Sequence, residues 1–317
     1  MAKKKKADNA QKKAAAAKIE QAKVEQIKEV KEIKEATVVE PAQATFKSEQ
    51  KAEKLAKTDK FCFKTFIKTV FAKKYDKNEN ILNIFKKPSL YGGILAEMIG
   101  AGILASILLL VSPSQGSIIL MIVMIGINLA FFGISGAQFN PAITAGMMAS
   151  RRISAIRGVM YMLAQIIGAW FGFMIVKGFM SENMTADQLM HMAEFTKKID
   201  VVLLVELIGS VIVGIFFARA SVNKKQALTF SILAASGIIT ALLIGTILTS
   251  VAELKGIYSI LNPAIAIIYQ VLPKSGEFGE LMQGLAVALG VYFVVPMVGS
   301  SLGFFLSDSM ETLSKED

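Results

Sequence analysis

Long apolar runs separated by short polar or charged stretches dominate the chain from about residue 90 onward. They cover about 92–111, 117–133, 158–176, 201–218, 227–250 and 281–306. Each run approaches the roughly 20 residues that an α-helix needs to cross the hydrocarbon core of a bilayer. This pattern predicts six membrane-spanning helices.

Two shorter apolar pieces, 141–150 and 263–272, each begin at the proline of an Asn-Pro-Ala tripeptide. Asparagine is a preferred helix cap, and proline is favoured at the first helical position. Ten residues rise only about 15 Å, half of the hydrocarbon thickness. One copy alone would indicate a turn, but two copies in the same context predict two half-helices. The tripeptides are Asn140, Pro141, Ala142 and Asn262, Pro263, Ala264.

The two tripeptides belong to a larger internal repeat. The segment "AEMIGAGILASI" (96–107) is similar to "VELIGSVIVGIF" (205–216), so Glu97 matches Glu206 and Gly100 matches Gly209. Each half holds three full spans, and the two halves therefore insert with opposite topology, as an inverted repeat. The predicted repeats cover about 90–177 and 200–306.

Charge and composition restrict the function. The chain is 53% hydrophobic, with a mean hydropathy of +0.51. Residues 1–87 hold 23 Lys and 12 Asp or Glu, whereas residues 88–317 hold 12 Lys or Arg and 13 Asp or Glu, so the basicity is confined to the N-terminal part. One cysteine excludes a disulfide within the chain, and one histidine leaves few zinc ligands. We expect no metal site, no cofactor and no enzyme.

The basic residues of the short loops predict the orientation, because such loops face the cytoplasm. Connection 177–200 is mildly acidic and is expected outside, which places both termini in the cytoplasm. The loops expected in the cytoplasm carry Arg151, Arg152 and Arg157, and Arg219, Lys224 and Lys225.

The N-terminal part divides in two. Residues 1–60, rich in Lys, Glu and Ala, are predicted to be a largely disordered tail or a solvated helix. Residues 61–87 are predicted to be an amphipathic juxtamembrane segment, which suits an anionic cytoplasmic leaflet. Basic residues with interleaved aromatics also occur in nucleic-acid-binding proteins, but no such module is visible. The membrane domain is expected over 88–307, followed by a cytoplasmic tail at 308–317.

Four segments together resemble the aquaporin and glycerol-facilitator (major intrinsic protein) family, from about Leu90 to Leu306. "SGAQFNPAIT" is similar to the first signature of the family, with Gln138 where histidine is usual. "YMLAQIIGAWFG" (161–172) and "VYFVVPMVGSSLG" (291–303) resemble its third and sixth spans. The second signature departs from the family, because "LNPAIA" places Ile265 where arginine is usual and Ile257-Tyr258 replaces Thr-Gly.

The resemblance implies an all-α membrane protein with a right-handed bundle of six spans plus two half-helices. It further implies a homotetramer, multi-pass in the plasma membrane, that conducts small neutral solutes and excludes protons and ions at the two Asn-Pro-Ala ends. Backbone carbonyls would form a ladder of acceptors along the pore. These carbonyls belong to Gly136, Ala137, Gln138, Tyr258, Ser259 and Ile260.

Spacing in the family also suggests a selectivity filter made of Leu120, Ser250, Ser259 and Ile265. These residues are smaller or less polar than the aromatic, histidine and arginine of water-selective relatives. They favour small polyols such as glycerol, or mixed solutes, over water alone. Glu253 or Lys255 folding back into the filter is an alternative, although a solvated position for both is the preferred interpretation.

Glu97 and Glu206 are carboxylates inside apolar spans, which are costly and usually functional. Paired acids would suit general acid–base catalysis. Their equivalent repeat positions favour instead the role that the family implies, which is to support the pore loops. Two alternatives to a channel remain: a closed, aquaporin-like tether that binds lipid or a partner through its basic tail, and a secondary transporter.

Overall fold

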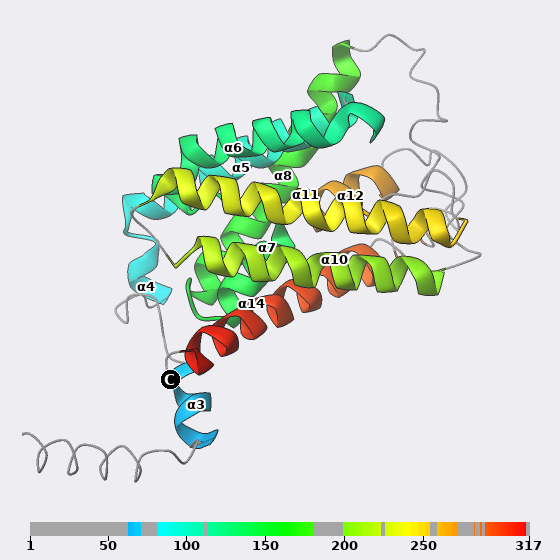
Figure 1. The fold of residues 1–317 in the computed structure, drawn as a ribbon. Helices are drawn as coiled ribbons and strands as arrows, with labels where there is room; N and C mark the ends of the chain where they lie inside the picture. The colour runs from blue at the N-terminus through cyan, green and yellow to red at the C-terminus, as the bar shows by residue number, and fades with distance from the viewer. Residues whose placement is uncertain are drawn as a thin grey trace, which may run out of the picture. The chain divides into compact units, whose positions relative to one another are not determined.

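Six long helices span the apolar runs. The computed structural model describes residues 63–70, 81–110, 113–179, 199–222, 226–253, 259–271, 282, 286 and 289–314. Within these residues all regular structure is helical, as Figure 1 shows. Six helices there are long and apolar enough to cross a membrane, which confirms the predicted fold class. They are α5 (Pro88–Leu110), α6 (Pro113–Ser135), α8 (Ala155–Phe179), α10 (Ile199–Ala220), α11 (Ala227–Val251), and η2 (Gly290–Val294) continuing into α14 (Val295–Leu313).

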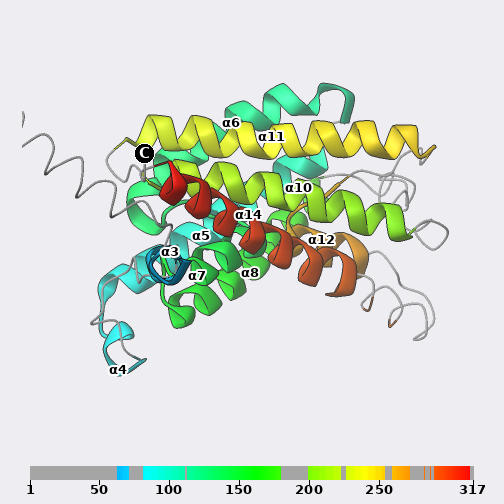
Figure 2. The same ribbon diagram turned by 60° about the horizontal axis from the view of Figure 1, so that its bottom comes forward.

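Two helices of nine residues begin at the repeated prolines: α7 (Pro141–Ala149) and α12 (Pro263–Val271). Nine residues rise about 13.5 Å, so neither helix crosses a bilayer by itself. Figures 1 and 2 place α7 toward one end of the long helices and α12 toward the other. The two short helices thus enter from opposite ends, as an inverted repeat requires.

Corresponding helix pairs pack in the same way in the two halves. Helix α5 lies against α8, and α10 lies against α14 (Figures 1 and 2). A side chain at Gly168 would clash with the carbonyl of Met98, and one at Gly299 would come within 2.8 Å of the carbonyl of Leu207. Met98 and Leu207 each follow a repeated glutamate. Small residues at equivalent positions therefore allow both close crossings.

The sixth span, predicted over 281–306, extends past its predicted C-terminal end. Residues 290–294 form a π-turn before Pro296, which has no N–H to donate to the preceding turn. At the other end the helix continues to Leu313, although hydropathy drops near Asp308. The carboxylate of Asp308 is buried and paired with Arg152, so the polar residue does not end the helix.

The amphipathic segment contains two short helices, α3 (Phe63–Val70) and α4 (Ile81–Ile84). Phe66 and Val70, one turn apart on α3, are buried, whereas Lys68 is exposed. The apolar side of α3 is therefore covered by protein. The predicted 1–60 tail lies outside the described residues, as do 71–80 and most of the 177–200 connection.

Candidate functional site

Two asparagines begin the half-helices in the same way. Asn140 has extended backbone angles, and its Oδ1 accepts a hydrogen bond from the N–H of Ala142 at 2.8 Å. Oδ1 of Asn262 accepts one from the N–H of Ala264 at 3.1 Å. Each side chain satisfies a helix N–H that would otherwise lack a partner, as the cap of a helix does.

The amide nitrogens of the same asparagines cross between the repeats. Nδ2 of Asn140 donates to the carbonyl of Leu261 at 2.8 Å, and Nδ2 of Asn262 donates to the carbonyl of Phe139 at 3.0 Å. Each acceptor is the residue just before the opposite asparagine. These reciprocal bonds hold the N-termini of α7 and α12 together.

Phe139 and Leu261 have left-handed backbone conformations, with φ of 51° and 56°. Such angles are unfavourable for residues with a side chain, so the surrounding structure has to stabilise them. Glycines make room for both side chains: a Cβ at Gly100 would clash with the Phe139 ring, and one at Gly209 would come within 2.6 Å of Leu261 Cδ2. The matched glycines of the sequence repeat thus lie against matched loop residues.

Glu97 binds the loop that precedes α7. Its carboxylate accepts hydrogen bonds from the N–H of Gln138 at 3.0 Å and the N–H of Phe139 at 2.6 Å. It also accepts from Nε2 of Gln165 at 2.7 Å, and the same nitrogen lies 2.9 Å from Oγ1 of Thr144. Gln165 was not singled out from the sequence, although its segment resembles the third span of the family.

Glu206 makes the equivalent contacts in the second repeat. Its carboxylate accepts from the N–H groups of Ile260 at 2.6 Å and Leu261 at 3.0 Å, and from Oγ of Ser259 at 3.2 Å. Both glutamates are fully buried. Each thus receives two consecutive loop N–H groups, the second of which belongs to the left-handed residue.

The four residues suggested for the filter occupy different environments. Leu120 and Ile265 are buried in one hydrophobic cluster. The hydroxyl of Ser259 points to Glu206, as described above. Ser250 is exposed in the last turn of α11, and its hydroxyl donates to the carbonyl of Thr246 at 2.7 Å. In the described part of the chain, no hydrogen bond joins Ser250 to the other three.

The loop of the first carbonyl set is irregular: Gly136 and Ala137 have φ of 89° and 50°, and Nε2 of Gln138 donates to the carbonyl of Ser135 at 3.4 Å. In the second set, Ser259 and Ile260 precede α12 without regular structure, and Tyr258 lies outside the described residues.

The alternative filter residues are placed only in part. Glu253 is exposed after α11, and Lys255 lies outside the described residues.

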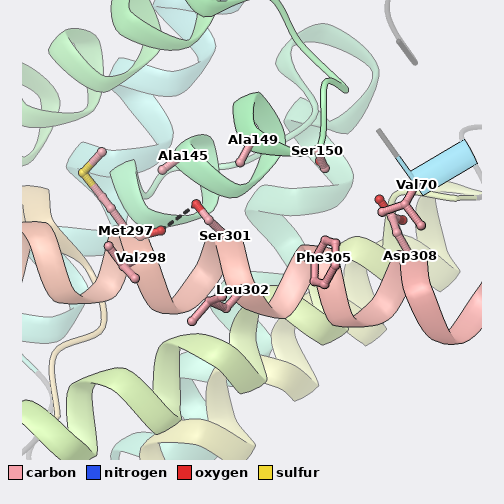
Figure 3. Close-up of a pocket in the computed structure, with 10 residues that line it drawn as sticks. All are labelled: Val70, Ala145, Ala149, Ser150, Met297, Val298, Ser301, Leu302, Phe305 and Asp308. Carbon is pink, nitrogen blue, oxygen red and sulfur yellow. Dashed lines mark hydrogen bonds between the residues drawn. The ribbon is translucent and has the colours of Figure 1, made fainter. Parts of the chain in front are cut away.

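A separate groove of about 470 Å³ runs between α7 and α14 (Figure 3). None of the described residues suggested for the pore lines it. Its walls are mostly apolar, and Asp308 lies at the end near Val70 of α3. The lining consists of Val70, Ala145, Ala149, Ser150, Met297, Val298, Ser301, Leu302, Phe305 and Asp308.

A comparison with protein families matches the description "Major intrinsic protein" over residues 85–306. The match covers the first five spans, both half-helices and the sixth span as far as residue 306. The chain belongs to the major intrinsic protein family. It is accordingly a multi-pass membrane protein, as the resemblance in the sequence implied.

Individual members of the major intrinsic protein family match over shorter segments. Glycerol uptake facilitator protein-like 6 of Lactiplantibacillus plantarum is 44% identical over 68 residues, 22% of this chain and 32% of that protein. Probable aquaporin PIP2-6 of Oryza sativa subsp. japonica is 47% identical over 55 residues, 17% of this chain and 20% of that protein. The chain thus aligns with about a fifth to a third of the length of these relatives.

Among solved structures, the aquaglyceroporin from Plasmodium falciparum is 18% identical. The alignment covers 70% of this chain and 93% of that one, with a TM-score of 0.39.

Proposed function

We propose that the protein is a passive channel for small neutral solutes, namely water, glycerol or similar polyols. The observation that carries this proposal is the pair of crossed hydrogen bonds between Asn140 and Asn262, which holds two half-helix N-termini tip to tip. Irregular backbone at membrane depth is stable only where protein buries it or where it lines a water-filled cavity. The loops before α7 and α12 fit such a pore.

The asparagines are the proposed point of ion exclusion. Each amide nitrogen has two hydrogens, and the crossed bonds use one of them, so one N–H per asparagine is left for a solute oxygen. Each half-helix also presents roughly half a positive charge at its N-terminus. Two such ends facing one point repel cations and orient a neutral oxygen toward the amides. Pro141, Ala142, Pro263 and Ala264 form the first turns that present these ends.

Backbone carbonyls are proposed to accept hydrogen bonds from the solute along the rest of the path. The N–H groups of Gln138 and Ile260 donate to the glutamates. This supports the role of the carbonyls, because the N–H groups of both loops are held by the protein and not by the solute. The acceptor set is that of the sequence prediction: Gly136, Ala137, Gln138, Tyr258, Ser259 and Ile260. Glu97 and Glu206 are then loop-supporting residues.

The filter is proposed to favour polyols. Leu120 and Ile265 supply apolar walls, and Ser250 and Ser259 complete the suggested set. A polyol has carbon atoms that suit an apolar wall and hydroxyls that suit a carbonyl ladder. Water has only the second property.

Reconstitution into liposomes tests the channel. Light scattering after a sucrose step is expected to show faster shrinkage than in protein-free liposomes, and a glycerol step should be followed by faster re-swelling. Absence of both accelerations would overturn the proposal in favour of a closed body. A pH-sensitive dye inside the same liposomes tests ion exclusion, because proton entry comparable to the water flux would contradict it.

A Leu120→Phe substitution tests the filter. The ring narrows the proposed constriction, so glycerol flux is expected to fall more than water flux. Leu228→Phe is the matched control, because Leu228 is exposed on α11. Equal effects of the two substitutions on the glycerol-to-water ratio would remove Leu120 from the filter.

The protein is proposed to be a homotetramer in the plasma membrane, with both termini in the cytoplasm. Static light scattering of the detergent complex measures the oligomer, and a monomer would contradict the tetramer.

The segment 61–87 is proposed to contact an anionic leaflet, and the exposed Lys68 of α3 supports this contact. Binding to vesicles with and without phosphatidylglycerol measures the lipid preference.

A further inference from the structure

Asn128 is a buried amide that the loop-supporting contacts do not use. It lies in the middle of α6, and none of its surface is exposed. Neither its Oδ1 nor its Nδ2 has a hydrogen-bond partner among the described residues. A buried amide without partners is destabilising, so it calls for an explanation. A polar side chain facing the interior of a membrane protein is by default functional.

The position of Asn128 on α6 points to the proposed pore. Leu120 and Met124 lie two turns and one turn before it on the same buried side of the helix, whereas Ile122 and Leu129 are exposed on the other side. Leu120 belongs to the suggested filter, about 12 Å away along the helix axis. The buried side of α6 therefore includes both the filter residue and Asn128.

The next turn of the same helix contacts the pore loop. The ring of Phe131, three residues after Asn128, packs edge-on against the ring of Phe139 at a centroid distance of 5.9 Å. Phe139 is the residue whose carbonyl accepts from Asn262. Asn128 thus lies between the level of the filter and the level at which the half-helices meet.

We propose that Asn128 is a hydrogen-bonding group for the solute, and that it sets the preference for polyols over water. This inference rests on the proposed channel function. The amide has a donor, Nδ2, and an acceptor, Oδ1. A polyol hydroxyl can therefore accept a hydrogen bond from Nδ2 or donate one to Oδ1. Because the amide is shielded from bulk solvent on every side, its partner has to arrive from inside the bundle.

The apolar neighbours of Asn128 strengthen the effect of its amide on the choice between glycerol and water. Leu120, Met124 and Ile127 of the same side offer a solute no side-chain hydrogen bond. A glycerol molecule that leaves other hydrogen bonds to enter this section regains one at Asn128. Water in a single file keeps bonds to its neighbours, and it depends less on the wall.

The test compares Asn128→Thr with Asn128→Val, which have the same shape and differ by a hydroxyl in place of a methyl. Glycerol and water permeabilities of reconstituted liposomes are measured for both variants. The glycerol-to-water ratio is expected to be about five- to tenfold lower in the valine variant than in the threonine variant. Equal ratios would overturn the inference while leaving the channel intact, and no flux in the unmodified protein would instead overturn the channel.

Ser300→Ala is the control for loss of a buried polar group away from this site. Ser300 is fully buried in α14, and its hydroxyl has no hydrogen-bond partner among the described residues. Its Oγ faces Gly146 of α7, where a Cβ would lie 2.9 Å away, and its carbonyl faces Gly214 of α10. The glycerol-to-water ratio of the Ser300→Ala variant is expected to stay within twofold of that of the unmodified protein. An equal shift in Ser300→Ala would also contradict a specific role for Asn128. A higher melting temperature in the valine variant, with an unchanged ratio, would indicate a purely structural amide.

Discussion

At the scale of single residues, the hydrogen bonds of Glu97 predict that its carboxylate stabilises the loop before α7. It accepts from two loop N–H groups and from Gln165, and it is fully buried. Glu97→Gln keeps the size but replaces one acceptor oxygen by a donor, which leaves a buried N–H unpaired. We expect a loss of about 1–3 kcal/mol, visible as a lower melting temperature in detergent, together with slower osmotic shrinkage of liposomes.

Glu311→Gln is the control for this substitution, because its pair with Arg219 at 3.1 Å is partly exposed. Exposed ion pairs contribute little to stability, so the control should melt within about a degree or two of the unmodified protein. If Glu97→Gln melts and conducts like the control, the carboxylate does not stabilise the loop.

The residues of the site differ in how visible they are in the sequence. Glu97 and Glu206 stand out because charged residues are rare in apolar spans, and the repeat pairs them. Gln165 does not stand out, because it is uncharged and the internal repeat does not pair it with a second amide. The crossed asparagine bonds were also hidden, because they depend on left-handed angles at Phe139 and Leu261, and neither residue type indicates such angles.

At the scale of helices, close crossings depend on glycines that face a backbone carbonyl. A Cβ at Gly303 would clash with the carbonyl of Val211 and come within 2.9 Å of Cα of Gly214, so α14 and α10 would have to separate. Gly303→Ala is expected to destabilise the protein by about 1–3 kcal/mol. The melting temperature of the purified protein measures this loss.

Gly126→Ala is the matched substitution, because no atom lies within 4 Å of a Cβ at that position of α6. Removing backbone freedom from a helix without a clash stabilises by up to about 1 kcal/mol, so this variant should melt at or above the unmodified protein. A drop of similar size in both variants would show that the close crossing of α14 with α10 does not determine the effect.

At the scale of the whole molecule, hydropathy and the repeated tripeptide were sufficient to predict six spans, two half-helices and the inverted repeat. They could not predict how the repeats are joined at the end of α7. Arg152 follows α7, and Asp308 lies 156 positions further along the chain. A hydropathy pattern carries no information on such a pair, and for the same reason it placed the end of the sixth span too early.

The Arg152–Asp308 pair ties the first repeat to the second. Nη2 of Arg152 lies 2.8 Å from Oδ1 of Asp308, and Nη1 lies 3.1 Å from Oδ2, while the guanidinium lies 5.0 Å from the centre of the Phe304 ring. Both side chains are nearly buried. Arg152→Ala leaves an uncompensated carboxylate, so we expect a loss of about 3–5 kcal/mol.

The double variant Arg152→Ala with Asp308→Ala distinguishes the stability that comes from the ion pair from the stability that comes from filling the space with the two side chains. Removing both charges leaves no unpaired buried ion, so the double variant should be more stable than Arg152→Ala alone, and the two single losses should not add. Melting temperatures of the four proteins measure this coupling. Additive losses would mean that the two residues stabilise the protein independently, and that the bidentate contact does not couple the end of α7 to α14.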